Sequence, residues 1–236
     1  MPYVEGFVVA VPTANKEAYR SHAAEAAPMF KEFGATRMVE AWADDVPDGT
    51  VTDFRKAVQA TEDESVVFSW FEYPSKEARD AATERMMADP RMEAMAATMP
   101  FDGKRMIFGG FLPFIDEGSS EGSAYVDGFV LPLGNEDGYR ALATKAAPIF
   151  REHGATRVVE AIGDDVPHGE VTDFYRAVQA QEGEGLVFSW IEWPSKDARN
   201  EGWKKVMEDA RMTPDGDMPF DGKRMFWGGF VPIVDA

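Results

Sequence analysis

The sequence carries one pattern twice, and this duplication limits the folds available to it. Residues 3–8, Tyr-Val-Glu-Gly-Phe-Val, return at 125–130 as Tyr-Val-Asp-Gly-Phe-Val, and Tyr19 returns as Tyr139 at an offset that then stays constant. Solenoids and propellers use units of roughly 20–50 residues, which are too short to explain this period. The chain therefore holds two copies of one domain, which can pack about a pseudo-twofold axis as the subunits of a homodimer do.

A small, polar and acidic segment joins the two copies. Residues 116–123 read Asp-Glu-Gly-Ser-Ser-Glu-Gly-Ser, which is the composition of a flexible linker. We expect a first domain over 1–116, a linker over 117–123 and a second domain over 124–236. Each domain is long enough to bury a modest core.

Charge and composition argue against several classes of function. The 42 acidic residues outnumber the 24 basic ones and give a net charge of −18, which disfavours nucleic acids and anionic membranes as partners. Without cysteine, disulfides, thiolate nucleophiles and iron–sulfur clusters are excluded. The first residues do not resemble a signal peptide, and no apolar run approaches the ~18 residues of a membrane span. We expect a cytoplasmic protein.

The spacing of apolar residues predicts the same elements in each copy. One helix is expected between Asn15 and Gly34, and a second from Ser75 to about Met99 with an interruption at Pro90. Residues 52–60 fit either a strand or a short helix, and we favour a strand. The other expected strands of the first copy cover 4–11, 36–43, 66–73 and 105–113.

This order of elements predicts the fold class. A β-α-β-β-α-β order is ferredoxin-like, with both helices on one face of an antiparallel sheet. The strands carry apolar residues on both faces, so the second face also needs a cover, which the other copy can supply. We predict an α+β protein in which two tandem ferredoxin-like domains pack sheet to sheet as a pseudo-dimeric α+β barrel.

Several motifs resemble a known bacterial family. Ala-Ala-Pro-x-Phe, Asp-Asp-Val-Pro-x-Gly, Val-Phe-Ser-Trp-x-Glu-x-Pro-Ser-Lys and Met-Pro-Phe-Asp-Gly-Lys-Arg-Met occur in both copies, and they are similar to the YbaA-like family catalogued as domain of unknown function 1428. The resemblance implies the dimeric α+β barrel superfamily, with one copy per chain and pairing between chains. Here the pairing would be intramolecular, and further self-association stays open. The resemblance implies no reaction and no catalytic residue set.

Polar residues within the strands are the candidate functional residues. Because side chains alternate along a strand, Glu40 shares a face with Trp42, and Trp70 shares a face with Glu72. If these faces line the barrel, the carboxyls would lie beside indoles and near arginines, and one with a raised pKa would serve as a general acid or base. The candidate catalytic residues are Glu40, Glu72, Arg105, Glu160, Glu192 and Arg224, and the candidate ligand-binding residues are Trp42, Trp70, Trp190, Asp53 and Asp173. The alternative interpretation is that the glutamates form ion pairs that fix the register between the sheets.

Other chemistry has little support in the sequence. None of the three histidines, His22, His153 and His168, has a histidine at the matching position of the other copy, so we expect no metal site. No phosphate loop, dinucleotide fingerprint or nucleophile elbow is present, and we expect no cofactor.

The favoured hypothesis is a protein that binds a small organic molecule in a pocket lined by strand aromatics and carboxylates, one pocket per copy. The first alternative is a metal-independent enzyme of the oxygenase or isomerase type, with a strand glutamate as base and Arg105 stabilising the anion that forms. The second alternative is a protein-interaction scaffold.

Overall fold

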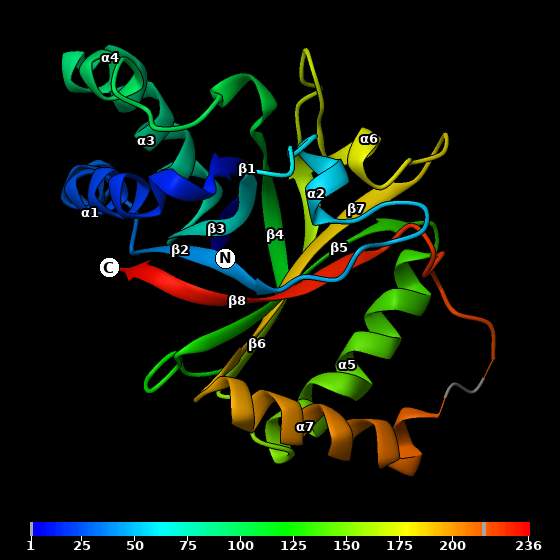
Figure 1. Cartoon of the computed structure of the whole chain (residues 1–236). Coiled ribbons are helices and arrows are strands. Elements are labelled where there is room, and N and C mark those ends of the chain that lie inside the picture. The colour runs from blue at the N-terminus through cyan, green and yellow to red at the C-terminus, as the bar shows by residue number, and fades with distance from the viewer. Residues whose placement is uncertain (1, 214–215) are drawn as a thin grey trace.

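The computed structural model describes residues 2–213 and 216–236, which form one eight-stranded barrel with helices on its outside (Figure 1). The first copy contributes β1 (Tyr3–Pro12), α1 (Lys16–Phe33), β2 (Arg37–Asp45), α2 (Phe54–Ala57), β3 (Glu64–Tyr73), α3 (Lys76–Ala88), α4 (Pro90–Ala96) and β4 (Ile107–Gly118). The second contributes β5 (Tyr125–Leu133), α5 (Glu136–Glu152), β6 (Arg157–Asp165), α6 (Phe174–Ala177), β7 (Gly185–Trp193), α7 (Lys196–Glu208) and β8 (Phe226–Asp235). Short 3-10 turns cover Thr13–Asn15, Gly103–Arg105 and Ala210–Met212.

The two copies share a single closed sheet. The strands follow the order β1-β3-β2-β8-β5-β7-β6-β4, and every neighbouring pair is antiparallel. The copies join where β2 pairs with β8 and where β4 pairs with β6. Closure leaves no unpaired sheet edge. The predicted α+β pseudo-dimeric barrel is confirmed. The two sheets face each other, as predicted, and they are also hydrogen-bonded to each other along both edges.

Aromatic rings from both copies fill the interior of the barrel. Phe68 stacks on Phe188 with ring centroids 4.6 Å apart, and Trp70 stacks on Trp190 at 4.5 Å. These rings lie so close to the backbone that a Cβ at Gly6 would come within 2.7 Å of the Phe188 ring. The interior is therefore a packed core that holds the two copies together.

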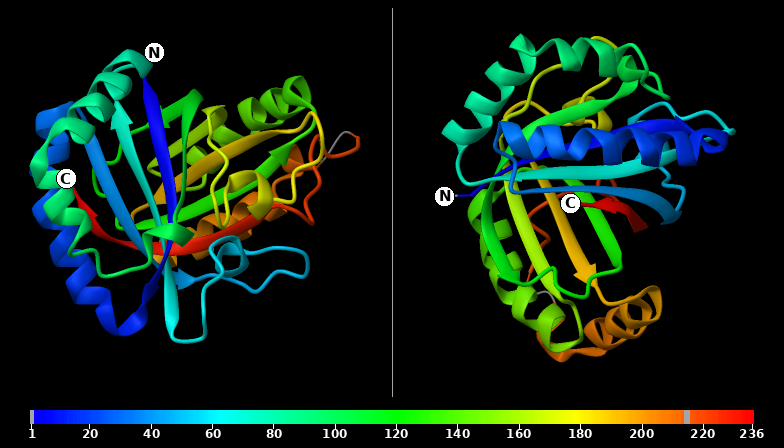
Figure 2. Two further views of the ribbon diagram at one scale, coloured as in Figure 1. Left: turned by 90° about the horizontal axis from the view of Figure 1, so that it is seen from above. Right: turned by 90° about the vertical axis from the view of Figure 1, so that its left-hand side faces the viewer.

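The helices cover the outer face of the barrel in two groups. Figure 2 shows α1, α3 and α4 over the strands of the first copy, with α5 and α7 over those of the second. The predicted break at Pro90 is confirmed, since α3 ends at Ala88 and α4 begins at Pro90. No helix in the described ranges is long and apolar enough to cross a membrane.

The strand favoured for residues 52–60 is wrong, because this segment contains the short helix α2. The Asp53 carboxylate accepts a hydrogen bond from the backbone N–H of Lys56 and caps the helix. The helix places Phe54 against the interior ring of Phe68, with centroids 5.7 Å apart. The spacing of apolar residues in so short a segment is compatible with a strand or a helix. The capping hydrogen bond of Asp53 favours the helix.

Candidate functional site

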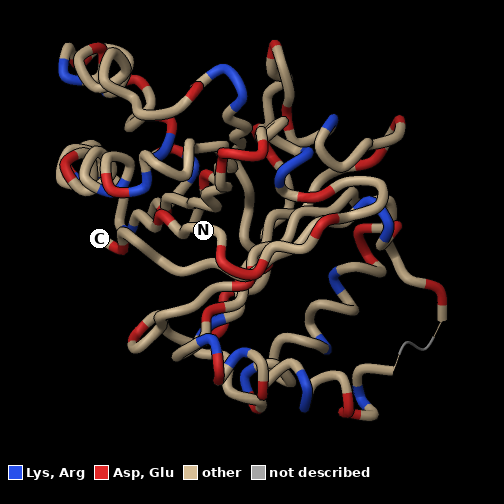
Figure 3. The backbone as a smooth tube through the Cα atoms, viewed as in Figure 1, with Lys and Arg blue, Asp and Glu red and all other residues tan. Residues whose placement is uncertain are grey.

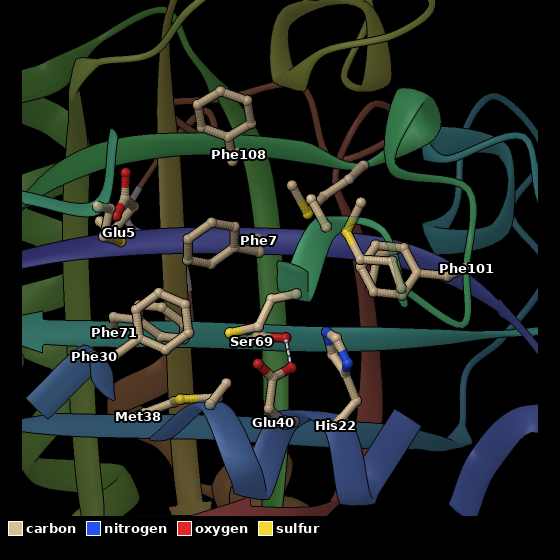
Figure 4. Close-up of a pocket in the computed structure, with 18 of the residues that line it drawn as sticks. Glu5, Phe7, His22, Phe30, Met38, Glu40, Ser69, Phe71, Phe101 and Phe108 are labelled. Atoms are coloured by element: carbon tan, nitrogen blue, oxygen red, sulfur yellow. Dashed lines mark hydrogen bonds between the residues drawn. The ribbon is translucent and has the colours of Figure 1, made fainter. Parts of the chain in front are cut away.

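A largely apolar pocket of about 310 Å3 lies between the first copy's helices and the outer face of its sheet. Its residues come from β1, β2, β3 and β4 on one side and from α1, α3 and α4 on the other, and Figure 4 shows the side chains of Glu5, Phe7, Glu40 and Phe71 among those that line it. Most of them are aromatic rings, methionines and alanines. The polar or titratable side chains that line it are those of Glu5, Tyr19, His22, Glu40, Ser69 and Thr83.

Strand alternation and helix periodicity explain how the pocket forms. Glu5 and Phe7 lie two residues apart on β1 and point to the same outer face, as do Ser69 and Phe71 on β3. On α1, the small side chains of the stripe that faces the sheet leave room between helix and strand, and one of them is Ala23. The methionines of α3, α4 and the turn that follows form the opposite wall, where unbranched side chains adapt to an irregular space.

Glu40 is a buried carboxyl in this pocket. Its Oε2 accepts hydrogen bonds from the Tyr19 hydroxyl at 2.6 Å and from the Ser69 hydroxyl. Its Oε1 has no hydrogen-bond partner among the described residues. Burial raises the pKa of Glu40 to about 7, although both hydroxyls act to lower it. The carboxyl therefore changes protonation state near neutral pH.

Glu5 is a second carboxyl in the same pocket. It is only 8% exposed, it makes no hydrogen bond within the described chain, and its nearest ion-pair contact is to the Arg79 guanidinium at 3.9 Å. Burial raises its pKa to about 7, with Arg79 opposing the rise. The nearby Tyr73 hydroxyl is also buried without a hydrogen-bond partner among these residues. Polar groups with unmet hydrogen bonds thus lie beside an apolar pocket.

The second copy differs from the first at this place. The carboxyl of Glu160 repeats the arrangement of Glu40 and accepts a hydrogen bond from Tyr139 at 2.6 Å. In contrast, Asp127, at the position of Glu5, accepts from the indole N–H of Trp203 at 2.7 Å. The Trp203 ring lies 4.9 Å from the Phe150 ring, centroid to centroid. The prediction of one pocket per copy stays a prediction, and in the second copy the Trp203 indole lies where the first copy has Thr83.

The predicted ligand-binding tryptophans of β3 and β7 lie elsewhere. Trp70 and Trp190 are fully buried in the interior of the barrel, on the face of the sheet opposite to the pocket. Trp42 does point outward, but it packs beneath α1, where its ring lies 6.4 Å from that of Tyr19. Alternation predicted correctly which residues share a face. It did not predict which face turns inward.

Glu72 and Glu192 are ion-paired at one end of the barrel. Arg37 contacts Glu192 of the other copy at 2.8 Å, and Arg157 contacts Glu72 at 2.7 Å. Burial alone would raise the pKa of Glu72, but the hydrogen bond and charge of Arg157 hold it below its ordinary value. These ion pairs, which link the two copies, leave Glu72 without the raised pKa that the hypothesis of a base required.

The remaining candidates have structural partners. Arg105 bonds to Glu64 at 2.6 Å, and Arg224 bonds to Glu184 at 2.6 Å. The arginines are therefore held away from Glu40 and are not in place to stabilise an anion formed there. Asp53 caps α2, and Asp173 caps α6 by accepting from the backbone N–H of Arg176. No cluster of three metal-ligating side chains occurs in 2–213 or 216–236.

Sequence reasoning missed Glu5, Tyr19 and Ser69. A usable signal was present for two of them, because Tyr19 and Ser69 recur as Tyr139 and Ser189, just as Glu40 recurs as Glu160, whereas the counterpart of Glu5 is Asp127. Polar residues kept at matching places inside apolar stretches usually bond to one another. The pairing between a helix residue and two strand residues becomes visible only in the fold.

The comparisons with known proteins agree with the fold. The family profile described as "Protein of unknown function (DUF1428)" matches residues 2–103 and again 124–222. "Uncharacterized protein YbaA" of Escherichia coli strain K12 is 69% identical over 117 residues, which cover 50% of this chain and 100% of that protein. The Shigella flexneri protein of the same name matches to the same extent.

Solved structures of distant sequence share the barrel. A "putative monooxygenase" from Fusobacterium nucleatum is similar with a TM-score of 0.62 and 12% identity, covering 99% of this chain and 93% of that one. An "anthrone oxidase-like protein" is similar with a TM-score of 0.51 and 11% identity, covering 100% and 92%. At these identities the likeness establishes the fold and no more.

Proposed function

This chain belongs to the DUF1428 family of proteins of unknown function, and we propose from its geometry that the first copy binds one small, largely apolar organic molecule in the pocket beneath α1, α3 and α4. The observation that carries the proposal is the pocket itself. Its volume of about 310 Å3 falls at the lower end of the range of small-molecule sites, and a few polar groups in an apolar lining are typical of such sites. A scaffold would need no such cavity.

The charges around the pocket limit the charge that its ligand can carry. Glu5 and Glu40 line it, and no lysine or arginine does. Acidic residues are also spread over both halves of the molecule (Figure 3). An anionic ligand would lose its hydration and meet two carboxyls in a lining without lysine or arginine, which costs free energy. The ligand is neutral or cationic.

Fluorescence titration with N-phenyl-1-naphthylamine, a neutral aromatic probe, tests this function. We expect saturable binding of one probe per chain. Thr83 lines the pocket, so Thr83→Trp fills it and should weaken binding at least tenfold. Met87→Trp adds the same ring at a side chain of α3 that is 86% exposed and should leave binding unchanged. Equal affinity in wild type and Thr83→Trp would place the probe elsewhere and count against the proposal.

A second candidate function is proton transfer by Glu40. Its Oε1 is free to face a ligand while Tyr19 and Ser69 hold Oε2, and a pKa of about 7 suits a general base. Oε1 would take a proton from a carbon next to a ligand carbonyl and return it to another carbon, an isomerisation with no net oxidation. Binding remains the first proposal, because Glu160 accepts the same tyrosine hydrogen bond in the second copy, where Trp203 stands in place of Thr83. The hydrogen bonds of Glu40 therefore do not by themselves indicate catalysis.

Deuterium exchange separates the two candidates. With a bound cyclic ketone such as 2-tetralone in D2O, we expect exchange at the carbon beside the carbonyl whose rate rises with pH through about 7, as the base loses its proton. Glu40→Gln should slow this exchange at least 100-fold while binding stays within threefold. Exchange that is as fast in the variant as in wild type would eliminate Glu40 as a base. NMR measures both quantities.

A further inference from the structure

The second copy holds an aromatic side chain where the first copy has its pocket. Position 83 of the first copy is threonine, and the matching position 203, one repeat later on α7, is tryptophan. The Trp203 ring lies 4.9 Å from Phe150 and 6.2 Å from Phe129. The matching residues of the first copy, Phe30 and Phe7, both line the pocket. The indole therefore occupies the counterpart of the open space.

The hydrogen bonds show the same relation. Asp127 receives the N–H groups of Trp203 at 2.7 Å and Trp193 at 2.9 Å, and it pairs with Arg199 at 2.8 Å. Its counterpart Glu5 has only the Arg79 contact at 3.9 Å. The Glu5 carboxyl thus makes none of the close bonds that Asp127 makes, and one of those bonds comes from the ring N–H of Trp203.

The neighbouring substitutions fit this arrangement. Trp193 stands where the first copy has Tyr73, and Gly202 stands where it has Ala82. A Cβ at Gly202 would come within 2.3 Å of the Trp193 ring, so the larger ring requires the glycine. The first copy retains the smaller pair, and the Tyr73 hydroxyl stays without a partner among the described residues. The second copy thus supplies hydrogen-bond donors to the Asp127 carboxyl from its own side chains, whereas the first copy supplies none to the Glu5 carboxyl among the described residues.

We infer that the first copy binds a flat aromatic molecule carrying an N–H or O–H donor, with the donor on Glu5 and the ring beside Phe7 and Phe30, as Trp203 is held in the second copy. The inference rests on the proposed function and adds to it the ligand class and a single site per chain. Trp203 acts as a built-in occupant that closes the second site.

Calorimetric titration of the full chain with indole and with 1-methylindole tests the ligand class. The two rings differ by the N–H donor. We expect one indole per chain and about tenfold weaker binding of 1-methylindole, which is the usual worth of a hydrogen bond to a carboxylate. Glu5→Leu removes the acceptor and should bring the two affinities within twofold, while Glu5→Gln keeps an acceptor oxygen and part of the preference.

Equal affinities in wild type, or a preference that survives Glu5→Leu, would overturn the inference while leaving the pocket as a binding site. Loss of binding for indole, 1-methylindole and N-phenyl-1-naphthylamine together would instead remove the proposed function. The two failures are therefore distinguishable.

The closed site is tested by counting bound indoles. Trp203→Thr gives the second copy the residue of the first and should raise the stoichiometry from one to two, whereas Trp203→Phe keeps a ring and should leave it at one. Thr83→Trp should lower it to zero, so the inference stays testable even if Trp203→Thr does not fold. A single site in folded Trp203→Thr, or unchanged binding in Thr83→Trp, contradicts the inference.

Discussion

At the scale of single residues, the buried carboxyls are the unusual feature of this chain. Glu40 and Glu160 each accept a tyrosine hydroxyl at 2.6 Å, and burial raises the pKa of both to about 7. Neither has an arginine or lysine as hydrogen-bond partner, in contrast to Glu72. Their charged form is therefore costly in the folded protein.

This cost makes stability depend on pH. A carboxyl whose folded pKa lies above its unfolded value of 4.5 favours folding at low pH, and this contribution is lost as pH rises through about 7. Wild type should therefore lose up to about 3 kcal/mol of unfolding free energy relative to Glu40→Gln between pH 5 and pH 8. Urea unfolding at both pH values measures it, and Glu25→Gln on the exposed side of α1 is the control. A difference that does not change with pH would contradict the burial argument.

At the scale of elements, the sequence predicted the strands well and their orientation poorly. Runs such as 66–73 alternate in a way that sets which side chains share a face. Both faces are apolar, however, because one packs inside the barrel and the other under helices, so hydrophobicity cannot tell Trp70 from Phe71. For this reason the sequence leaves open which face lines the barrel, and of the predicted site residues only Glu40 lines the pocket.

The short helix α2 could not be predicted from the sequence either. The capping bond of Asp53 and the left-handed backbone of Gln59, with φ of 51°, define α2 and its end. Asn and Asp adopt positive φ more readily than Gln does, so the residue type at position 59 did not indicate that the helix ends there. The domain boundary at 116–123 remains a prediction, and in the structure β4 extends as far as Gly118.

At the scale of the whole molecule, duplication has joined two sheets into one barrel and left their outer faces to diverge. The inner faces meet across the pseudo-twofold axis, where each copy must complement the other, as in the stacked pair of Trp70 and Trp190. The outer faces have no such constraint. One keeps a pocket while the other holds Trp203, and fusion into one chain is what allows the two to differ.

The ion pairs at the barrel end should hold the copies together. Glu192 is fully buried and faces Arg37 of the other copy at 2.8 Å. Glu192→Leu removes the buried partner of Arg37, which keeps its pairs with Asp235 at 2.8 Å and Glu72 at 3.3 Å, and should lower the free energy of unfolding by about 1.5–3 kcal/mol. Glu17→Leu, which removes an exposed pair with Arg20, should change it by less than about 1 kcal/mol. Urea unfolding measures both, and a similar small effect in the two variants would contradict the proposed role of the pairs.

The most direct test of the account is a crystal structure of the full chain with bound indole. We expect one ring beneath α1 and α3, with its nitrogen within hydrogen-bond distance of Glu5 and with Trp203 unmoved in the second copy. A ring bound inside the barrel between Trp70 and Trp190, or at the second copy in place of Trp203, would contradict it.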